Sequence, residues 1–289
     1  MPSLLPPVSD SDLARIHSAS ERVLAETGFR VGSPRLRDHC RSAGAQVDDA
    51  SRVVRFPPEL LGALLAQAPS QFAVSGVDGT RWTLGGGEQH CLAIVTDPWI
   101  VDYGTREPRR PRLEDLRRHT IIANALPRVF AVSRMDFPVE DYPGPHSSLR
   151  ALQEHLRYHR KHVYILPADV ASFRDWLELG EIMTCGSLAG SGLFTLGAAV
   201  LSPLALSELN CDLLMLACQY GFAVVPTVCP QAGSTAPYSL AGTLLQANVE
   251  NLAVVALTQI VAPGNPAIYA VGPSVADMRS GHDRYYTLD

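Results

Sequence analysis

One carboxylate stands alone in the most apolar part of the sequence. Glu250 is the only formally charged residue between Asp212 and Asp277. The surrounding stretch, from Arg174 to Arg279, contains no other lysine or arginine. A charge in such surroundings is paired, neutralised by protonation or held for a function. Glu250 therefore has two interpretations: it contacts a ligand, or it hydrogen-bonds neighbouring backbone and braces a loop behind a pocket.

Three histidines share another spacing that could do chemistry. His155, His159 and His162 follow one another at i, i+4 and i+7, so they would lie on one face of a helix. Such a spacing suits metal ligation. Basic residues stand between and beside these histidines, however, and disfavour the binding of a cation. We therefore predict a solvated helix face and no metal site.

Composition excludes several classes of function. The net charge is −5 and no run of lysine or arginine is present to follow a phosphate backbone, so nucleic acid is not an expected partner. An aldolase or lyase that forms a Schiff base needs a lysine on a strand, and none occurs after Lys161. Hydrophobic residues make up 46% of the 289 positions, enough for a sizeable core.

The expected compartment is the cytoplasm. None of the six cysteines forms a C-x-x-C pair, which predicts scattered buried thiols in a reducing environment. The first ten residues lack the basic and apolar regions of a signal peptide. The uncharged segment Gly186–Ser207 is interrupted by several glycines and a proline, which favours a buried strand and loop over a membrane span.

The chain divides into two regions with different predicted secondary structure, and these regions must position the residues named above. Residues 1–112 predict a cap of helices and small antiparallel strands. The expected helices are 9–26, 34–44 and 58–67, and the expected strands are 52–56, 72–75, 81–84 and 92–96. Residues 113–289 predict strands that alternate with helices. The expected strands are Val129–Ser133, Val163–Leu166, Phe194–Val200, Ala223–Val228 and Ala267–Val271, and the expected helices are Leu113–Ala125, His146–Lys161, Ala171–Met183, Pro203–Tyr220 and Ser239–Val261. This pattern fits a doubly wound sheet or part of a (β/α)8 barrel.

An ordered set of short motifs resembles one family. The segments are Cys229-Pro-Gln-Ala-Gly-Ser-Thr-Ala-Pro-Tyr-Ser-Leu-Ala-Gly242, Gln246-Ala-Asn-Val-Glu250, Gln259-Ile-Val-Ala-Pro-Gly264 and Asp277-Met-Arg-Ser-Gly281. Further matches near the front are Ile16-His17, Leu24-x-x-Thr-Gly28, Ala43-Gly44-Ala, Phe56-Pro-Pro, Ala68-Pro69-Ser and Gly76-x-Asp78. In this order they resemble the trimethylamine–corrinoid methyltransferase family over nearly the whole chain.

The resemblance implies a fold and a reaction. The fold class would be α/β, a TIM-type (β/α)8 barrel behind an α+β cap, with about five strand–helix units present here. The reaction would move a methyl group from a methylated amine, such as trimethylamine or glycine betaine, to the cobalt of a separate corrinoid protein. This chain would bind no cofactor and no metal of its own. The family's following segments extend roughly three units beyond Asp289, and the pyrrolysine position of trimethylamine enzymes lies there.

Candidate site residues follow from the barrel expectation, because barrels place their sites at the carboxyl ends of the strands. Carboxylates and aromatic faces suit a cationic amine. The substrate-binding candidates are Asp136, Tyr164, Ser202, Gln231, Ser234, Glu250 and Tyr269. Structural alternatives are helix capping for Asp136 and Ser202, a turn leading to a helix capped by Ser239 for Gln231 and Ser234, and packing on the helices for both tyrosines.

An incomplete barrel has consequences for activity. Five strands of eight leave open edges that are costly to expose, which favours a homo-oligomer or a longer chain. The alternative to the methyltransferase is a catalytically inactive amine-binding or regulatory relative.

Overall fold

The structure is a computed structural model that describes residues 8–94, 99–135 and 139–284. The chain forms two compact units, each built from separate stretches of sequence. Unit 1 comprises Met1–Ala68, Ala199–Asp212 and Val225–Asp289, and unit 2 comprises Pro69–Ala198 and Leu213–Val224. The predicted domain boundary after residue 112 stays a prediction.

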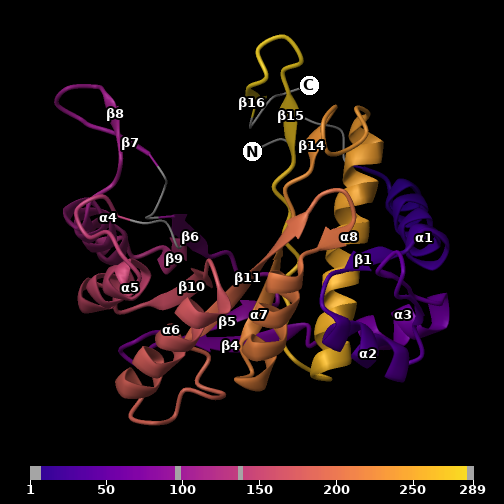
Figure 1. Ribbon diagram of the computed structural model, residues 1–289, viewed down its shortest axis with the longest axis horizontal. Coiled ribbons are helices and arrows are strands. Elements are labelled where there is room, and N and C mark those ends of the chain that lie inside the picture. Colours follow the sequence, from indigo (N-terminus) through magenta and orange to yellow (C-terminus); the bar gives the residue numbers. More distant parts are fainter. Residues whose placement is uncertain (1–7, 95–98, 136–138, 285–289) are drawn as a thin grey trace. The chain divides into compact units, whose positions relative to one another are not determined.

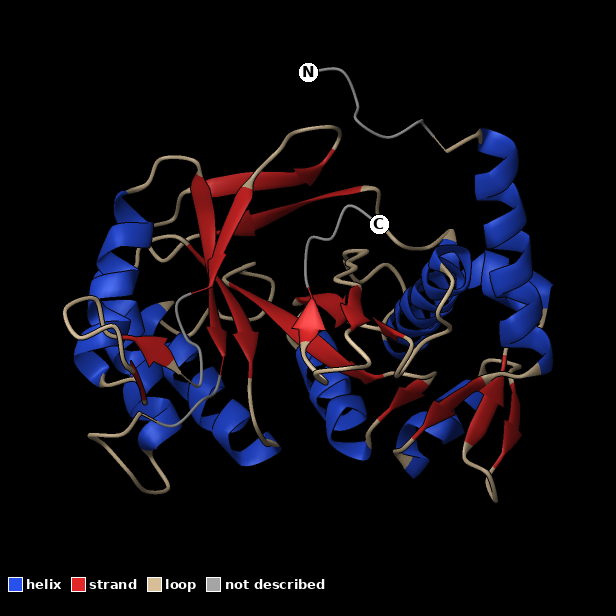
Figure 2. Cartoon of the chain, turned by 90° about the horizontal axis from the view of Figure 1, so that it is seen from above, coloured by secondary structure: helices blue, strands red, loops and turns tan. Residues whose placement is uncertain are grey.

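Unit 1 is organised around one long buried helix. Its helices are α1 (Asp10–Glu26), α2 (Pro34–Ser42), α3 (Pro58–Leu65) and α8 (Leu240–Val261). Ser9 and Ser239 cap α1 and α8 through their hydroxyl oxygens, which accept backbone N–H groups, and α2 and α3 begin with proline. Helices α1, α2 and α3 all pack against α8 (Figures 1 and 2).

Short strands complete unit 1. One set is β1 (Phe29–Val31), β2 (Gln46–Asp48), β3 (Val53–Arg55) and β12 (Ala205–Leu206). Strand β1 pairs with β3 antiparallel and with β12 parallel, and β12 pairs antiparallel with the end of β11 (Phe194–Leu201). A second set of three, joined in the order given, is β14 (Gln231–Ala232), β15 (Ser274–Ala276) and β16 (Asp283–Arg284).

Unit 2 contains consecutive parallel strands. Four strands lie side by side in the order in which they occur in the chain: β6 (Cys91–Ile94), β9 (Val129–Met135), β10 (His162–Leu166) and β11. Each adjacent pair of them is parallel. The helices that follow them are α4 (Leu113–Ala125), α5 (Ser147–Tyr158) and α6 (Val170–Met183). Apolar residues of α4, α5 and β9 pack together in a core that includes Leu116, Val132 and Ala151. Alternating strands and helices thus share their buried faces, as the apolar patterns predict.

Two hairpins, and two elements that belong partly to each unit, complete the list of elements. Strands β4 (Gln71–Ser75) and β5 (Arg81–Gly85) pair antiparallel, as do β7 (Ile100–Val101) and β8 (Pro108–Arg109). Helix α7 (Glu208–Gln219) and strand β13 (Ala223–Thr227) pass, like β11, from one unit to the other. Strand β13 also pairs with β11.

The fold class is mixed α/β with a parallel-rich sheet. Within the described residues, the strands do not close into a barrel. In the series β6, β9, β10, β11 and β13, each strand pairs with the strand before it, as consecutive strands do in a barrel. The (β/α)8 barrel itself stays a prediction.

Three predicted elements are wrong in detail. Residues 203–207 are not helical, because the Leu204 backbone donates to Glu250 and accepts from Arg30, and helix α7 starts only at Glu208. The predicted strand Ala267–Val271 is replaced by isolated bridges. There the Asn251 amide binds both the N–H and the C=O of Ala270, at 3.0 and 2.9 Å, in place of a strand partner.

The third correction concerns residues 92–96, which were expected in the antiparallel cap. Residues 91–94 instead form β6, which pairs parallel with β9. This strand lies at the edge of the parallel sheet, where Leu92 is 46% exposed, and residues 95 and 96 lie outside the described part of the chain.

The predicted solvated histidine face is also wrong. His155, His159 and His162 are 0%, 0% and 1% exposed. His155 lies 3.2 Å from the Thr120 hydroxyl, and His162 Nε2 lies 2.8 Å from the Thr195 hydroxyl. Neutral imidazoles can satisfy such partners in a core, which is why neighbouring cations in the sequence did not expose them. Within the described residues, no cluster of three or more acidic, histidine or cysteine side chains is arranged to hold a metal.

The cysteine prediction holds for half of its residues. Cys40, Cys211 and Cys218 are buried, whereas Cys91, Cys185 and Cys229 are exposed, and all six are free thiols. Burial raises the pKa of the Cys218 thiol to about 12, as expected for an inert core residue. Helix α8 is long and apolar enough to cross a membrane by composition alone, but 67% of its most apolar window is buried within the fold.

Candidate functional site

The lone carboxylate Glu250 lies in the middle of α8 and is fully buried. The helix places it there because leucine, alanine and valine surround it on every face, so nearly the whole helix is core. Burial removes water as a partner, and the carboxylate must find hydrogen-bond donors within the protein.

Three neutral donors surround the Glu250 carboxylate. The Ser202 hydroxyl donates to Oε2 at 2.7 Å, and the Leu204 backbone N–H donates to Oε1 at 3.0 Å. The amide of Gln246, one turn earlier on α8, donates to Oε1 at 3.0 Å and to the Thr235 carbonyl oxygen at 2.8 Å. Glu250 and Gln246 thereby tie together the turn after β11 and the loop after β14.

Cys229 lies just after β13 and is exposed. Its pKa is raised by desolvation first, and then by the negative charges of Asp283 and Glu250. Two carboxylates therefore act on one thiol at the carboxyl end of β13. A local surplus of negative charge favours a cationic ligand over an anionic one.

The loop after β13 is tightly folded. The Gln231 carbonyl accepts the backbone N–H groups of Ser234, Thr235 and Ala236, each at 3.0 Å. Gln231 is half-buried, whereas the Ser234 side chain is exposed. Gly233 has a φ of +85°, a conformation that a side chain would strain. This loop and the Ser202 turn are brought together by Gln246 and Glu250.

Ser202 does not cap the following helix. The Ser207 hydroxyl accepts the N–H of Asn210 at 3.2 Å and fills that place, while the Ser202 hydroxyl is used by Glu250. The capping alternative for Ser202 is therefore wrong. Ser239 does cap α8, with its hydroxyl 3.2 Å from the Gly242 nitrogen, as predicted.

Tyr269 does not join this group. Its hydroxyl donates to Asn248 Oδ1 at 3.0 Å, and the Asn248 amide donates to the Ser20 hydroxyl of α1 at 2.9 Å. Asn248 and Glu250 are two residues apart on a helix, so they point to different faces. Tyr269 is thus fixed on the α1 side of α8, with 53% of its surface exposed.

The remaining candidates belong elsewhere. Tyr164 lies in β10 of unit 2, where its hydroxyl is close to Gly197 of β11; a Cβ on that glycine would come within 2.5 Å of it. Asp169, after β10, caps α6 by accepting the Ser172 N–H at 2.7 Å. Asp136 lies outside the described residues.

Sequence reasoning missed Gln246, Cys229 and Asp283. Gln246 was detectable, because a side chain four residues before Glu250 lies beside it on a helix. Cys229 and Asp283 carry no such signal, since 21 and 33 residues respectively separate them from Glu250 in the chain.

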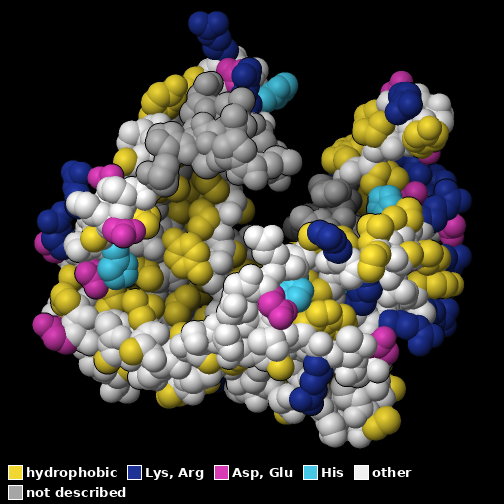
Figure 3. All heavy atoms as spheres, turned by 180° about the vertical axis from the view of Figure 1, so that it is seen from behind, with side chains coloured by type: hydrophobic (Ala, Val, Ile, Leu, Met, Phe, Trp, Pro, Cys, Tyr) yellow, Lys and Arg dark blue, Asp and Glu magenta, His cyan; other side chains and the backbone are white. Residues whose placement is uncertain are grey.

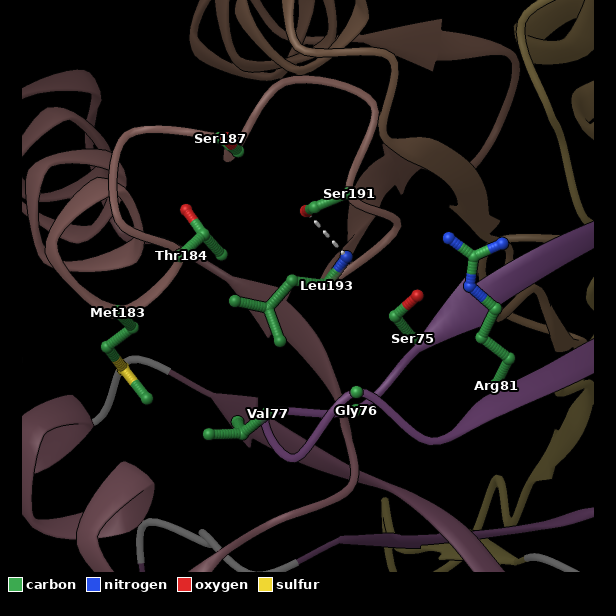
Figure 4. Close-up of a pocket in the computed structure, with 10 residues that line it drawn as sticks. Ser75, Gly76, Val77, Arg81, Met183, Thr184, Ser187, Ser191 and Leu193 are labelled. Carbon is green, nitrogen blue, oxygen red and sulfur yellow. Dashed lines mark hydrogen bonds between the residues drawn. The ribbon is translucent and has the colours of Figure 1, made fainter.

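A cavity of about 270 Å³ in unit 2 provides a contrast (Figure 4). Hydroxyl groups of Ser75, Thr184, Ser187 and Ser191 lie around it, and Arg81 is the only charged residue among the described residues that line it. It lies at the amino end of β11, next to Leu193. A guanidinium without a carboxylate in the lining disfavours a cation, so the Glu250 group is the better candidate for an amine.

Comparison with known proteins defines the class. A mixed α/β fold with a buried helix carboxylate that binds the turn after a strand is compatible with many enzymes. The sequence match narrows the choice of family. The family model described as trimethylamine methyltransferase (MTTB) matches residues 3–285. The chain belongs to the trimethylamine methyltransferase family.

Individual relatives agree with this assignment. The chain is 26% identical over 275 residues to the trimethylamine methyltransferase MttB of Desulfitobacterium hafniense, covering 94% of this chain and 55% of that protein. It is 26% identical over 282 residues to MttB of Methanosarcina barkeri, covering 93% and 56%. A glycine betaine methyltransferase of Desulfitobacterium hafniense is 26% identical over 278 residues, covering 95% and 57%. The chain spans little more than half the length of these relatives.

Proposed function

We propose that this chain takes part in moving a methyl group from a methylated amine, trimethylamine or a quaternary amine such as glycine betaine, to the cobalt of a separate corrinoid protein in the cytoplasm. Family membership supports the reaction class, because relatives are named for both donors. The corrinoid is the methyl acceptor and belongs to the partner. This chain's own part is to bind and orient the amine.

The chemistry sets what the site has to supply. The bond between carbon and nitrogen breaks, its electron pair stays on nitrogen, and the methyl carbon forms a bond to the attacking cobalt. A positive charge on nitrogen makes the departing amine a good leaving group. The protein must therefore hold a cation, direct one methyl group outward and keep water away.

The observation that carries the proposal is the uncancelled charge of Glu250. Its donors are a hydroxyl, an amide and a backbone N–H, all of them neutral, and no lysine or arginine within the described residues forms an ion pair with it. Its negative charge is stabilised in place but its field is not neutralised. Asp283 adds to that field at the Cys229 end of the site.

Binding of a simple cation tests this directly. Titration calorimetry with tetramethylammonium should show saturable binding to the chain, and the Glu250→Gln variant should bind at least tenfold more weakly, which is about 1.4 kcal/mol. Glu59→Gln, an exposed position on α3, is the matched control and should leave the affinity unchanged. An uncharged analogue, in which a tert-butyl group replaces the methylated ammonium group, should bind weakly to the unaltered chain and to both variants.

A second variant guards against misfolding of the first. Asp283→Asn changes an exposed residue, so the fold should persist, and the affinity for tetramethylammonium should fall by a smaller factor. Equal binding of the cation and its uncharged analogue by the unaltered chain would contradict the assigned role of Glu250.

Transfer is measured separately. The chain is mixed with reduced corrinoid protein and trimethylamine or glycine betaine, and the cobalt absorption spectrum is followed. Methylation of the cobalt supports the proposed reaction. Cation binding without methylation by either donor supports the alternative, an amine-binding or regulatory relative.

A further inference from the structure

The cavity of unit 2 is lined by a guanidinium that has no carboxylate partner. Arg81 of β5 is exposed, and in the part of the chain that the structure describes no carboxylate binds it. Basic side chains are numerous on the surface of unit 2 (Figure 3). Two of them on α4, Arg117 and Arg118, both bind the Glu114 carboxylate at 2.9 Å. Arg81 differs from these two, because its guanidinium is available to an anion that enters the cavity.

Two carboxylates stand close to the lining residues in the chain, and both have other partners. Asp78 accepts the Thr80 N–H at 3.0 Å, and this contact is the main reason why its pKa is lowered. Glu181 accepts the Leu188 N–H at 3.3 Å. Neither carboxylate is among the residues that line the cavity. The positive charge of Arg81 is therefore not cancelled inside it.

The end of α6 contributes Thr184 to the lining. A helix C-terminus usually presents free carbonyl groups, which repel an anion. Here the Gly180 carbonyl accepts both the N–H and the hydroxyl of Thr184, each at 2.9 Å, and the Glu181 carbonyl accepts the Gly186 N–H at 2.8 Å. These contacts occupy carbonyl groups that would otherwise oppose an anion.

Hydroxyl groups supply further donors. Within the described residues, the Ser75 and Ser187 hydroxyls have no hydrogen-bond partner. Ser191 Oγ accepts the Leu193 N–H at 3.1 Å, so its own proton stays free to be donated. Hydroxyl donors beside a guanidinium provide the hydrogen bonds that an oxyanion requires.

The opposite side of the cavity is apolar. Val77 and Met183 lie across it from Arg81, with Leu193 between them (Figure 4). Leu193 is 2% exposed, so packing holds its side chain in place. A ligand that contacts both sides carries charged oxygens at one end and hydrocarbon at the other. Inorganic phosphate would leave the apolar side without a partner.

The two walls are fixed and enclose a small volume. The Ser75 N–H donates to the Gly192 carbonyl at 2.8 Å, which joins β4 to the loop before β11. Gly76 allows a close approach here, since a Cβ would lie 2.6 Å from the Arg160 carbonyl oxygen. The volume of about 270 Å³ is slightly below the roughly 300–1,000 Å³ of sites for drug-sized ligands. A preformed site of this size suits a molecule of a few carbon atoms.

We propose that this cavity binds a small carboxylate with a short apolar chain, which places its carboxylate against Arg81 and its hydrocarbon against Met183. The planar guanidinium matches the two oxygens of a carboxylate. The site lies within unit 2 and uses none of the residues around Glu250, so it does not depend on the proposed methyl transfer.

Titration calorimetry of the full chain with butyrate tests the site. Butyrate should bind saturably, with a dissociation constant on the order of 1 mM. Acetate should bind about tenfold more weakly, because it buries less hydrocarbon. Butanol, which has the chain but no charge, should also bind at least about tenfold more weakly. In saturation-transfer NMR, the terminal methyl group of butyrate should receive the strongest signal, because it lies against the apolar side.

Two variants separate the two ends of the ligand. Arg81→Gln should weaken the binding of butyrate at least about tenfold. Met183→Gln keeps the side-chain length, and should weaken butyrate roughly threefold while leaving acetate unchanged. Arg128→Gln is the matched control, since this arginine of unit 2 is also exposed but does not line the cavity. The melting temperatures of all three variants should match that of the unaltered chain.

Three results would each overturn the proposal. One is the absence of saturable butyrate binding below about 50 mM. Another is an Arg81→Gln variant that binds butyrate as tightly as the unaltered chain does. The third is binding of inorganic phosphate or butanol that equals or exceeds the binding of butyrate.

Discussion

At the scale of single residues, two buried carboxylates are stabilised in opposite ways. Glu154 of α5 is fully buried beside arginines, with Arg117 nitrogens at 2.7 and 2.8 Å and Arg150 and Arg157 within 3.7 Å. Those guanidinium groups cancel its charge. Glu250 is equally buried, but in the part of the chain that the structure describes its hydrogen-bond donors are all neutral. A buried charge left uncancelled costs stability, and a cationic ligand is the partner that would recover that cost.

The only lysine of the chain also has a structural task. The ammonium of Lys161 donates to the carbonyl oxygens of Ala123, Leu126 and Val129, at 3.3, 2.6 and 2.6 Å. Desolvation lowers its pKa, and the three carbonyls, which run from the last turn of α4 to the start of β9, use all three of its N–H groups. A cation at a helix C-terminus also faces the negative end of the helix dipole.

Removing that ammonium should weaken the end of α4. Lys161→Met keeps the aliphatic stem but leaves three carbonyls without their donor, so urea unfolding should show a loss of about 1–3 kcal/mol in the free energy of unfolding. Arg160→Met, at the exposed neighbouring position, should change it by less than about 0.5 kcal/mol. Equal losses in the two variants would show that the three carbonyl contacts contribute nothing.

Sequence alone singled out Glu250 but did not indicate how its hydrogen-bond partners would be arranged around it. The isolation of Glu250 is visible in the pattern of charges, and burial follows from it. Its partner Ser202 lies 48 residues away and becomes a neighbour only because the turn after β11 meets α8. Tyr269 was expected near the same site, yet a hydrogen bond to Asn248 directs it to another helix face. Side-chain orientation depends on tertiary partners that no local pattern records.

At the scale of elements, local signals decided the helices and non-local contacts decided the exceptions. Helices α1, α3 and α8 begin where a serine cap or a proline predicts. The short strand β12 was not predictable, because it pairs with the end of β11 and with β1, and β1 lies some 170 residues earlier. The same holds for β14, which pairs with β15 more than 40 residues later. Two-residue strands carry no periodicity of their own.

The histidines that join α5 to β10 make the stability of unit 2 dependent on pH. Burial lowers the pKa of both His159 and His162 from 6.5 to about 4. The folded protein keeps them neutral, whereas the unfolded chain takes up protons near pH 6.5. Their contribution is therefore complete above about pH 6.5 and is lost as the pH falls toward 4.

Unfolding by urea across this window should show the loss. Each of the two histidines contributes roughly 3 kcal/mol to the loss of unfolding free energy, at about 1.4 kcal/mol for each unit by which its pKa is lowered. In the His162→Asn variant, the slope of unfolding free energy against pH should be smaller between pH 6.5 and 4. His17→Asn, on the exposed side of α1, should leave the slope unchanged. A flat profile for the unaltered chain in this window would contradict the argument.

At the scale of the whole molecule, the chain builds each unit from distant segments. Helices α1, α2 and α3 pack on α8, although more than 170 residues separate the end of α3 from the start of α8. The three N-terminal helices have their apolar faces covered largely by α8, so their stability depends on a helix near the other end of the described chain. Elements of unit 2, by contrast, find their partners nearby in sequence, as α4, α5 and β9 do.

This arrangement predicts which regions open together. Leu257→Ala removes a fully buried side chain from α8, and Leu152→Ala removes one from α5. Each should cost about 2–5 kcal/mol in its own unit. Hydrogen exchange of the intact chain, followed by mass spectrometry, should then show faster exchange in α1, α2 and α3 for Leu257→Ala. Faster exchange in α4 and β9 should mark Leu152→Ala, because locally cooperative units open separately. Uniform acceleration along the whole chain in both variants would mean that the two units unfold as one.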